Sequence, residues 1–425
     1  MDDLYIKRNI LCIDLKSFFA SVECVERHLD PYTTPLVVCD PTRDGAITLA
    51  VAPYLKQFGV KGRSRVFELP KNINILKVPP RMRLYQQKSK EVIKIYLEYV
   101  SSEDLHIYSI DECFLDITNY LKLYKKTDYE LAKDILARVY DSTGLTATAG
   151  IGPNLLLAKV SMDIEAKHNK DNIARWTYDD VKEKLWRITP LSKMWGIGSH
   201  MERNLNALGL ISVGDIACYD KEKLKKKFGV MGEQLWFHAN GIDLSKISDL
   251  NNMPVKEKSY SHSQILFKDY YDYNINIIIY EMLDVLCRRL RTNKKLCGLI
   301  GFGIGYSKSV GGGFYHSNKL AIQTDDANIL YREIMHIFTR YYTHAPIRKV
   351  SISLGKLTNN ESRQLDLFES SEKMEEKISI NNAIDDIKNR FGANILLPAS
   401  SLLEDSTIME RNNKIGGHHA WSWND

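Results

Sequence analysis

An acidic bend between two short apolar runs constrains the fold of this chain more than any other feature. Residues 106–118 (HIYSIDECFLDIT) predict a strand, a tight turn and a second strand, with Asp111 and Glu112 at the bend. A third carboxylate, Asp14, ends the apolar run 9–14, which is typical of a short buried strand. If these strands are neighbours in one sheet, the three carboxylates meet at its edge.

Such a group of carboxylates has a specific chemistry. Mg²⁺ prefers oxygen ligands and usually binds one or two carboxylates together with substrate phosphates. Two such ions can stabilise both the attacking and the leaving oxygen of an in-line displacement. A plain solvated turn remains the alternative, because Asp is a favoured turn residue and adjacent strand residues point to opposite faces.

The length of the chain predicts several domains. At 425 residues it exceeds a single core, since domains average about 150 residues. The N-terminus does not resemble a signal peptide, and no apolar run reaches the ~18 residues of a membrane span. We therefore expect a cytoplasmic protein with no membrane partner. The seven cysteines show no C-x-x-C spacing, so neither a zinc site nor a disulfide framework is expected.

Further secondary structure follows from the pattern of apolar residues. Strands are predicted at 35–39, 46–51 and 146–150, and helices from about Pro53, at 128–141 and at 154–166. A smaller helical region runs from about 170 to 245, and the polar segment 248–252 is predicted to be a linker. In an α+β region, strands at 299–306 and 350–354 alternate with helices at 275–291 and 326–341, before a final helix near 381–391.

The charges are unevenly distributed along the chain. The net charge is +5, yet residues 251–360 contain 15 Lys and Arg against 8 Asp and Glu, a net +7. Residues 361–425 contain 7 against 12, a net −5. A basic module of domain size favours a phosphate-backbone partner, although an ordinary solvated basic face is the alternative.

Four motifs, in order along the chain, resemble the Y-family translesion DNA polymerases. They are Cys12–Asp14 with Ser17–Glu23, Tyr108–Ile117, Ala149–Gly152 with Leu157–Lys159, and Trp195–Gly198. The resemblance looks closest to the UmuC-type branch that Gram-positive bacteria and their mobile elements carry as ultraviolet-damage repair proteins.

The resemblance implies an α+β, multidomain, right-hand polymerase. Residues 1–170 would form the palm, with fingers inserted at about 31–80. Residues 171–247 would form a helical thumb with a helix-hairpin-helix, and 251–358 an α+β little finger. Residues 359–425 would form a C-terminal tail.

The resemblance also implies the catalytic groups. Asp14, Asp111 and Glu112 would be the catalytic residues and would bind two Mg²⁺ ions, with the backbone carbonyl of Leu15 as a further ligand.

Five residues would bind the incoming dNTP. Phe19 occupies the position of the sugar gate and Phe18 should line the same pocket, with core packing as the alternative for both rings. Lys159 matches the family's triphosphate lysine, consistent with a cation aimed at phosphate charge. Lys56 stands where the family often has arginine, without the bidentate fork of that residue, and Tyr54 lies one position later than the family's tyrosine.

Two regions are candidates for binding DNA. Gly196 and Gly198 have helix-hairpin-helix character, in which backbone N–H groups at a helix start can dock a phosphate; a simple helix connection is the alternative. In the basic module, the loop that begins at Lys308 is a candidate for backbone contact. A cationic cluster is a further candidate: Arg288, Arg289, Arg291, Lys294 and Lys295.

A short apolar motif lies in the acidic C-terminal segment. Apolar side chains on an exposed acidic tail are unfavourable unless a partner buries them. The motif resembles the peptide by which bacterial polymerases bind the β-subunit sliding clamp, with a structural role as the alternative. Its residues are Gln364, Leu365, Asp366, Leu367 and Phe368. Partners of the UmuD or RecA type are suggested by analogy alone.

The predicted function is DNA-directed DNA synthesis past damaged template bases in DNA repair and the SOS response. The primer 3′-hydroxyl of primer–template DNA would attack a dNTP. A nucleotidyl cyclase would share the palm chemistry but would not need a helix-hairpin-helix, a basic module or a clamp peptide. A catalytically impaired adaptor that binds clamp and DNA is the third hypothesis, which the presence of all three acids disfavours.

Overall fold

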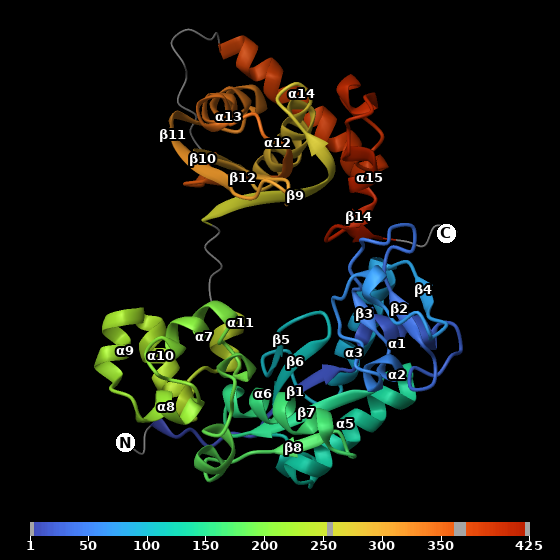
Figure 1. Ribbon diagram of the computed structural model, residues 1–425, viewed down its shortest axis with the longest axis vertical. Coiled ribbons are helices and arrows are strands. Elements are labelled where there is room, and N and C mark those ends of the chain that lie inside the picture. The colour runs from blue at the N-terminus through green and yellow to red at the C-terminus, as the bar shows by residue number, and fades with distance from the viewer. Residues whose placement is uncertain (1–3, 253–257, 361–370, 421–425) are drawn as a thin grey trace. The chain divides into compact units, whose positions relative to one another are not determined.

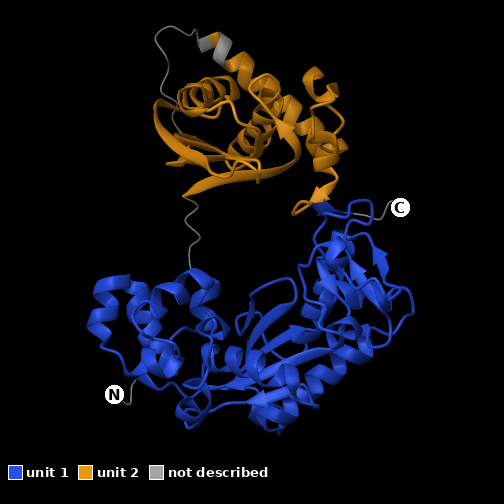
Figure 2. Ribbon diagram, in the orientation of Figure 1, with its two compact units in different colours: residues 1–253, 418–425 blue, residues 254–417 orange. Residues whose placement is uncertain are grey.

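The computed structural model describes residues 4–252, 258–360 and 371–420. The chain divides into two compact units, residues 1–253 with 418–425, and residues 254–417 (Figure 2). Helices and strands occur in both units (Figure 1), which agrees with the predicted α+β, multidomain architecture. Within the described residues, no helix combines the length and the apolar character that crossing a membrane requires.

Unit 1 is built around a five-stranded sheet in the order β5-β6-β1-β7-β8. All neighbours are antiparallel except β7 and β8, which are parallel. The strands are β1 (Ile10–Leu15), β5 (Leu105–Ile107), β6 (Glu112–Asp116), β7 (Ala147–Gly152) and β8 (Ile173–Arg175). The predicted strand, turn and strand over 106–118 is therefore confirmed.

The central strand β1 is buried on both faces, which explains its continuous apolar run. Alternate residues of a strand point to opposite faces. Leu11 and Ile13 join one core cluster, while Ile10 and Cys12 join another. Helices cover both faces of this sheet: α1 (Phe18–Val25), α3 (Met82–Tyr96), α5 (Asp128–Thr143) and α6 (Leu155–Ile164). Asp14 is thus the first polar residue at the end of a fully buried strand.

A small three-stranded sheet lies between α1 and α3 in the sequence. Its order is β3-β2-β4, and it has its own apolar cluster around Val37, Val51 and Leu55. Its elements are β2 (Leu36–Val38), β3 (Ala50–Val51), α2 (Pro53–Gln57) and β4 (Leu76–Val78). The predicted strand 46–51 is wrong in its extent, because only its last two residues form a ladder, and Ile47 makes an isolated bridge to Arg65.

The predicted helical region between 170 and 245 is confirmed. Its core gathers Trp176, Leu205 and Leu235. Ser212 and Asp220 cap two of its helices by accepting hydrogen bonds from backbone N–H groups. The helices are α7 (Ser199–Asn206), α8 (Val213–Cys218), α9 (Lys221–Phe228) and α10 (Val230–Ala239).

The division between the two units follows the predicted linker at 248–252 directly, but these residues themselves are not a loop, because they lie in helix α11 (Ile247–Asn252). Ile247 is buried in a cluster with residues of β1 and α6. The Asn251 side chain donates a hydrogen bond of 2.9 Å to the backbone carbonyl of Leu105 in β5. The polar composition of this segment therefore did not indicate the helix, which buried Ile247 and the Asn251 hydrogen bond hold against the sheet.

Unit 2 contains a second antiparallel sheet in the order β11-β10-β12-β9, with β13 beside β10. Helices α12 and α13 pack against this sheet (Figure 1). The elements are β9 (Ser259–Tyr270), α12 (Ile275–Thr292), β10 (Lys295–Tyr306), β11 (Gly313–Thr324), α13 (Ala327–Tyr341), β12 (Ile347–Gly355) and β13 (Thr358–Asn359). Strands β9 and β11 were missed, since only three residues of β9 and two of β11 are buried and many of their exposed residues are polar.

Where a polar tail was expected, helical segments pack onto unit 2. Arg291 of α12 pairs with Asp385 through two hydrogen bonds of 2.6 and 2.9 Å. The buried carboxylate of Glu281 accepts hydrogen bonds from Ser406 and Thr407. The segments include α14 (Ser371–Phe391), which begins well before the predicted residue 381, and α15 (Ile408–Asn412). Charged partners on α12 explain this packing.

The remaining short elements complete the chain. They are α4 (Leu121–Tyr124), β14 (Lys414–Ile415), β15 (His418–His419) and helical turns at Val66–Glu68, Ala166–His168, Val181–Leu185, Leu191–Lys193 and Ala399–Leu402.

Candidate active site

Strand pairing brings the three predicted carboxylates to one edge of the unit 1 sheet. Asp14 of β1 is the register partner of Glu112 at the start of β6. Asp111 directly precedes Glu112, and its backbone carbonyl accepts a 2.9 Å hydrogen bond from the N–H of Leu15. The Asp111 carboxylate accepts a 2.6 Å hydrogen bond from Ser109, which orients it at the bend. The three acids and Leu15 are thus neighbours along two adjacent strands.

Lysines, rather than other carboxylates, contact these acids. Lys159 lies 2.8 Å from Glu112, and Lys167 lies 3.3 Å from Asp14. Within residues 4–252, 258–360 and 371–420, no group of three or more His, Cys, Asp or Glu side chains is arranged to hold a metal ion. The donor set nevertheless fits Mg²⁺ chemically, because it consists of oxygen ligands. Binding of a metal ion to Asp14 would require Lys167 to release that carboxylate.

Two glycines allow Lys159 to reach Glu112. A Cβ at Gly150 would lie 2.0 Å from the carbonyl oxygen of Ala158, and one at Gly152 would lie 2.4 Å from the backbone nitrogen of that residue. Because both glycines lack a Cβ atom, α6 can pack directly on β7. Asn154 begins this helix by accepting a 2.9 Å hydrogen bond from the N–H of Leu157. The glycine motif in the sequence therefore has a packing function that supports the site.

Lys159 is almost fully buried, with 6% of its surface exposed. Its ammonium group contacts Glu112 at 2.8 Å and Asp163 at 3.0 Å. The Cys12 thiol adds a 3.2 Å hydrogen bond to the same Glu112 oxygen. Burial opposes the charge, but Cys12, Glu112 and Asp163 outweigh it and raise the pKa of Lys159. Lys159 is thereby held by carboxylates in the interior.

The sequence interpretation missed Lys167. Its side chain is 37% exposed and lies 2.7 Å from Asp163 as well as 3.3 Å from Asp14. Burial lowers the pKa of this ammonium group, whereas Asp14 and Asp163 raise it more, so the net shift is upward. The helical spacing could have indicated it, since Lys159, Asp163 and Lys167 follow one another at intervals of four residues.

Asp14 is the acid with the most strongly shifted pKa at this edge. Burial raises its pKa most, Asp111 and Glu112 raise it further, and Lys167 opposes them, giving a pKa of about 6. Carboxylates that crowd together in a partly dry site resist ionisation, and a cation relieves that repulsion. Asp14 is therefore poised to bind a positive ligand near neutral pH.

The two adjacent phenylalanines have different environments. Phe18 is 3% exposed and packs in the core, as the alternative interpretation expected. Phe19 is only partly buried and stacks on Tyr85, with ring centroids 4.5 Å apart and planes inclined by 15°. The Tyr85 hydroxyl donates a 2.6 Å hydrogen bond to the buried carboxylate of Glu23, which Arg81 also binds. Phe19 thus has a rigid support beneath its ring.

Helix α2 carries the other two nucleotide-binding candidates. Tyr54 packs edge-on against Phe58, with ring centroids 5.1 Å apart. The Lys56 side chain is exposed. Enough protein surrounds the Lys56 ammonium to lower its pKa, although Asp14 acts in the opposite direction. The electrostatic coupling to Asp14 associates Lys56 with the acidic edge of the sheet.

The DNA-binding candidates lie in turns. Gly196 has a φ of +89°, which favours glycine, and Gly198 precedes the first residue of α7. Lys308 is exposed in the turn between β10 and β11, where Gly311 and Gly312 have φ values of +73° and +75°. The clamp-like motif at 364–368 lies outside the described residues.

The cationic cluster of α12 differs from the sequence interpretation. Arg291 pairs with Asp385, and Arg288 donates a 2.6 Å hydrogen bond to Asn389. The guanidinium group of Arg289 lies 4.1 Å from the ring centre of Tyr260. At least two of these arginines therefore attach α14 to unit 2.

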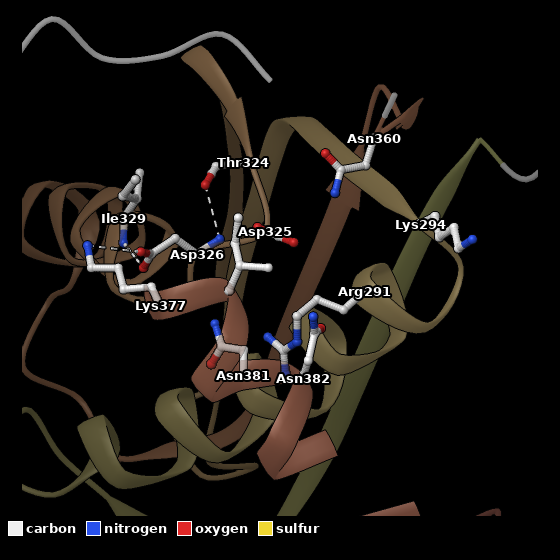
Figure 3. Close-up of a pocket in the computed structure, with 11 residues that line it drawn as sticks. Arg291, Lys294, Thr324, Asp325, Asp326, Ile329, Asn360, Lys377, Asn381 and Asn382 are labelled. Carbon is white, nitrogen blue, oxygen red and sulfur yellow. Dashed lines mark hydrogen bonds and ion pairs between the residues drawn. The ribbon is translucent and has the colours of Figure 1, made fainter. Parts of the chain in front are cut away.

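A separate pocket of about 330 Å³ lies in unit 2 (Figure 3). It is lined by the start of α13, the end of β11 and α14. Lys377 faces Asp326 at 3.8 Å, and the N–H of Asp326 donates a 3.0 Å hydrogen bond to Thr324. Arg291, already paired with Asp385, forms part of the wall. The carboxylates of the acidic edge are not among its lining residues.

Family models match three successive parts of the chain. The impB/mucB/samB family model matches residues 13–163, the HHH motif of the IMS family matches 178–210, and the C-terminal domain of the impB/mucB/samB family matches 257–367. The UvrX protein of Bacillus subtilis (strain 168), named for UV-damage repair, is 40% identical over 97% of this chain and 98% of its own length. The chain belongs to the impB/mucB/samB family of Y-family DNA polymerases. Membership identifies it as a DNA-directed DNA polymerase.

Two further relatives agree with this membership. The protein named DNA polymerase IV 2 of Bacillus subtilis (strain 168) is 35% identical over 96% of this chain and 98% of its own length. A solved "Y-family DNA polymerase chimera Dbh-Dpo4(243-245)-Dbh" aligns with a TM-score of 0.64 at 21% identity, covering 83% of this chain and all of that chain. The structural likeness shows the shared fold, and the predicted family and fold class are confirmed.

Proposed function

We propose that this family member extends primers past damaged template bases, with the acidic edge of the unit 1 sheet as its active site. The primer 3′-hydroxyl would attack the α-phosphate of a dNTP, a new phosphodiester bond would form, and pyrophosphate would leave. The observation that carries this proposal is the register pairing of Asp14 with Glu112, beside Asp111. This pairing supports a single site on two adjacent strands.

Asp14, Asp111 and Glu112, together with the backbone carbonyl of Leu15, would hold two Mg²⁺ ions. Such ions, when bound, stabilise charge on the attacking and leaving oxygens. The raised pKa of Asp14, about 6, is consistent with this assignment, because burial first and the charges of Asp111 and Glu112 next disfavour an ionised carboxylate, which a bound cation would favour. Below a pH of about 6, a metal ion would have to compete with a proton for the Asp14 carboxylate.

The two lysines of the site would have different tasks. Lys159, buried between Glu112 and Asp163, would hold the Glu112 carboxylate in position. Lys167 is more exposed and would turn from Asp14 to the triphosphate, and Lys56 would contribute a second cation. Phosphate recognition needs cations that can reach the ligand. The exposed fractions of the two side chains support this division of roles.

Phe19 would act as the sugar gate, with its ring set against the ribose 2′ position. Its stacking on Tyr85 supports the role, since a gate must resist displacement. Phe18 would support the pocket from the core. Tyr54, packed against Phe58, would border the nucleotide from α2.

Contacts outside the active site would hold the DNA and a partner. Gly196 and Gly198 would present backbone N–H groups to a phosphate, and Lys308 would contact the duplex backbone. The division into palm 1–170, thumb 171–247, little finger 251–358 and C-terminal segment 359–425 belongs to this proposal. So do clamp binding through 364–368, UmuD- or RecA-like partners, a role in the SOS response and a cytoplasmic location.

Primer extension across an abasic site tests the proposal. The full chain with Mg²⁺ should extend a labelled primer past the lesion, and Asp111→Asn should abolish extension while DNA binding in a mobility-shift assay persists. If the unaltered chain binds DNA but extends no primer, the adaptor hypothesis replaces this one. If Asp111→Asn retains full activity, the active-site assignment is wrong.

A further inference from the structure

Asp163 connects the two lysines that contact the acidic edge. One of its carboxylate oxygens lies 3.0 Å from the Lys159 ammonium group, and the other lies 2.7 Å from that of Lys167. The lysines stand four residues before and four residues after Asp163 in the sequence. Lys159 and Asp163 lie in α6, which ends at Ile164, and Lys167 lies in the helical turn 166–168 that follows. Each lysine also contacts an acid of the proposed active site, Glu112 or Asp14. Asp163 is therefore linked to Glu112 through Lys159 and to Asp14 through Lys167.

The charge arrangement gives Asp163 a definite role. Lys159 and Lys167 repel each other, and Lys159 lowers the pKa of Lys167 through this repulsion. A lysine is a flexible point charge that occupies whichever acceptor is available. Without Asp163, the remaining acid partner of Lys167 at this edge would be Asp14. Lys167 would then compete for a carboxylate that a metal ion needs.

We propose that Asp163 is a positioning residue that holds Lys167 beside the triphosphate and keeps it from closing on Asp14. The inference rests on the proposed function and assigns it a residue that does not itself touch substrate. As nucleotide and metal enter, Lys167 exchanges its 3.3 Å contact with Asp14 for a phosphate oxygen and keeps its 2.7 Å contact with Asp163. Lys159 stays on Glu112 throughout.

A purely structural role for Asp163 predicts a different outcome. Its pair with Lys167 is 30–37% exposed on both sides, and pairs of this kind contribute little to stability, while buried Lys159 keeps Glu112 as its other carboxylate partner. Removing Asp163 should therefore scarcely change the melting temperature. Its effect should instead appear in nucleotide binding, because a charge-assisted hydrogen bond to phosphate depends on where the lysine is held.

The test measures dNTP binding by the full chain on primer–template DNA. Ca²⁺ replaces Mg²⁺, because it also takes oxygen ligands and binding can be followed apart from turnover. Asp163→Asn should raise the dNTP dissociation constant on the order of tenfold, the loss expected for one charge-assisted hydrogen bond. In Mg²⁺, KM should rise more than kcat falls. Asp163→Glu, which keeps the charge, should restore most of the affinity.

A double substitution identifies the residue through which Asp163 acts. In a Lys167→Gln background, Asp163→Asn should cause little further loss, since the two changes would remove one shared interaction. Asp134→Asn removes a comparable exposed carboxylate paired with Lys126, and it should bind dNTP like the unaltered chain. Thermal melting of each variant controls for folding.

The outcomes separate this inference from the proposed function. If the unaltered chain binds no dNTP, the proposed function fails and the inference falls with it. If the unaltered chain binds dNTP and Asp163→Asn binds it equally well, only the inference is overturned. A loss in Asp163→Asn that is fully additive with Lys167→Gln also overturns it, because Asp163 then acts independently of Lys167.

Discussion

The lysine ion pairs of the acidic edge in unit 1 differ in geometry from the Arg291–Asp385 pair that attaches α14 in unit 2. At the acidic edge, lysines meet Asp14, Glu112 and Asp163 by single contacts of 2.7 to 3.3 Å. In unit 2, the Arg291 guanidinium binds both carboxylate oxygens of Asp385. Arginine forms a rigid fork, whereas lysine is a rotatable point charge. Lys388 of α14 also makes a single 2.8 Å contact with Asp284, so a lysine pair can serve attachment as well. The difference therefore lies between the rigid fork of Arg291 and the partly exposed Lys167, which can leave Asp14 for another ligand.

The largest expected effect is the loss of primer extension when a carboxylate of the acidic edge in unit 1 is removed. Asp111→Asn should lower primer extension by at least ~10³-fold, because it removes a charge aimed at the reacting phosphate. Steady-state extension assays with a matched DNA-binding measurement give the result. Asp385→Asn in unit 2 is the control, and it should retain extension in conditions where the protein stays folded. Comparable catalytic losses in both variants would remove the distinction between the two regions.

Arg291→Met tests whether the Arg291–Asp385 pair attaches α14 in unit 2. This change leaves a mostly buried Asp385 carboxylate without its guanidinium partner, and should lower the free energy of unfolding of unit 2 by about 2–3 kcal/mol. Urea denaturation followed by circular dichroism measures it. Arg348→Met is the control, because the Arg348–Asp269 pair is substantially exposed and should contribute less than ~1 kcal/mol. Equal losses would contradict the assigned role of Arg291.

The pH dependence of extension tests whether Asp14 must be ionised. Its pKa of about 6 predicts that extension falls about tenfold per pH unit below 6, while DNA binding changes much less. The pKa in the folded state lies above the ordinary value of 3.8, so the folded protein holds this proton more tightly than the unfolded chain. Stability should therefore decrease as pH rises from about 4 to about 6. A pH–rate profile and denaturation at several pH values measure both effects.

A profile that stays flat down to pH 5 would show that Asp14 is not the titrating metal ligand. Asp14→Asn supplies the matched control, because it should remove the stability change between about pH 4 and 6. It should also abolish extension at every pH.

The smallest expected effect is a change in stability that distinguishes the two-hydrogen-bond geometry of the Arg291 guanidinium from its positive charge alone. Arg291→Lys keeps the positive charge but loses the second hydrogen bond to Asp385, and should cost about 1 kcal/mol of stability. The same urea titration applies, with Arg291→Met as the upper bound. A stability equal to that of the unaltered chain would mean that charge alone attaches α14.

Part of the site could be predicted because it depends on local pattern. The apolar run that ends at Asp14 and the acidic bend at Asp111 and Glu112 each carry their own strand and turn signals. Elements with polar faces were harder to predict from the sequence. The first half of β9 alternates exposed serines with Tyr260, His262 and Gln264, and α11 packs through Ile247 and Leu250, so each resembles a loop until its packing partner is present.

The fold class, the strands that carry the acids and the glycines at 150 and 152 can all be identified in the amino-acid sequence. The different environments of the two lysines became apparent only from the folded structure. Lys159 is buried against Glu112, and Lys167 lies half-exposed beside Asp14. The spacing of four residues on either side of Asp163 does not distinguish the two lysines, because it does not show that α6 ends at Ile164 and that Lys167 lies in the turn beyond it. Their distances from the sheet edge differ only once α6 has packed on β7, and burial then separates a structural cation from one that can reach a ligand.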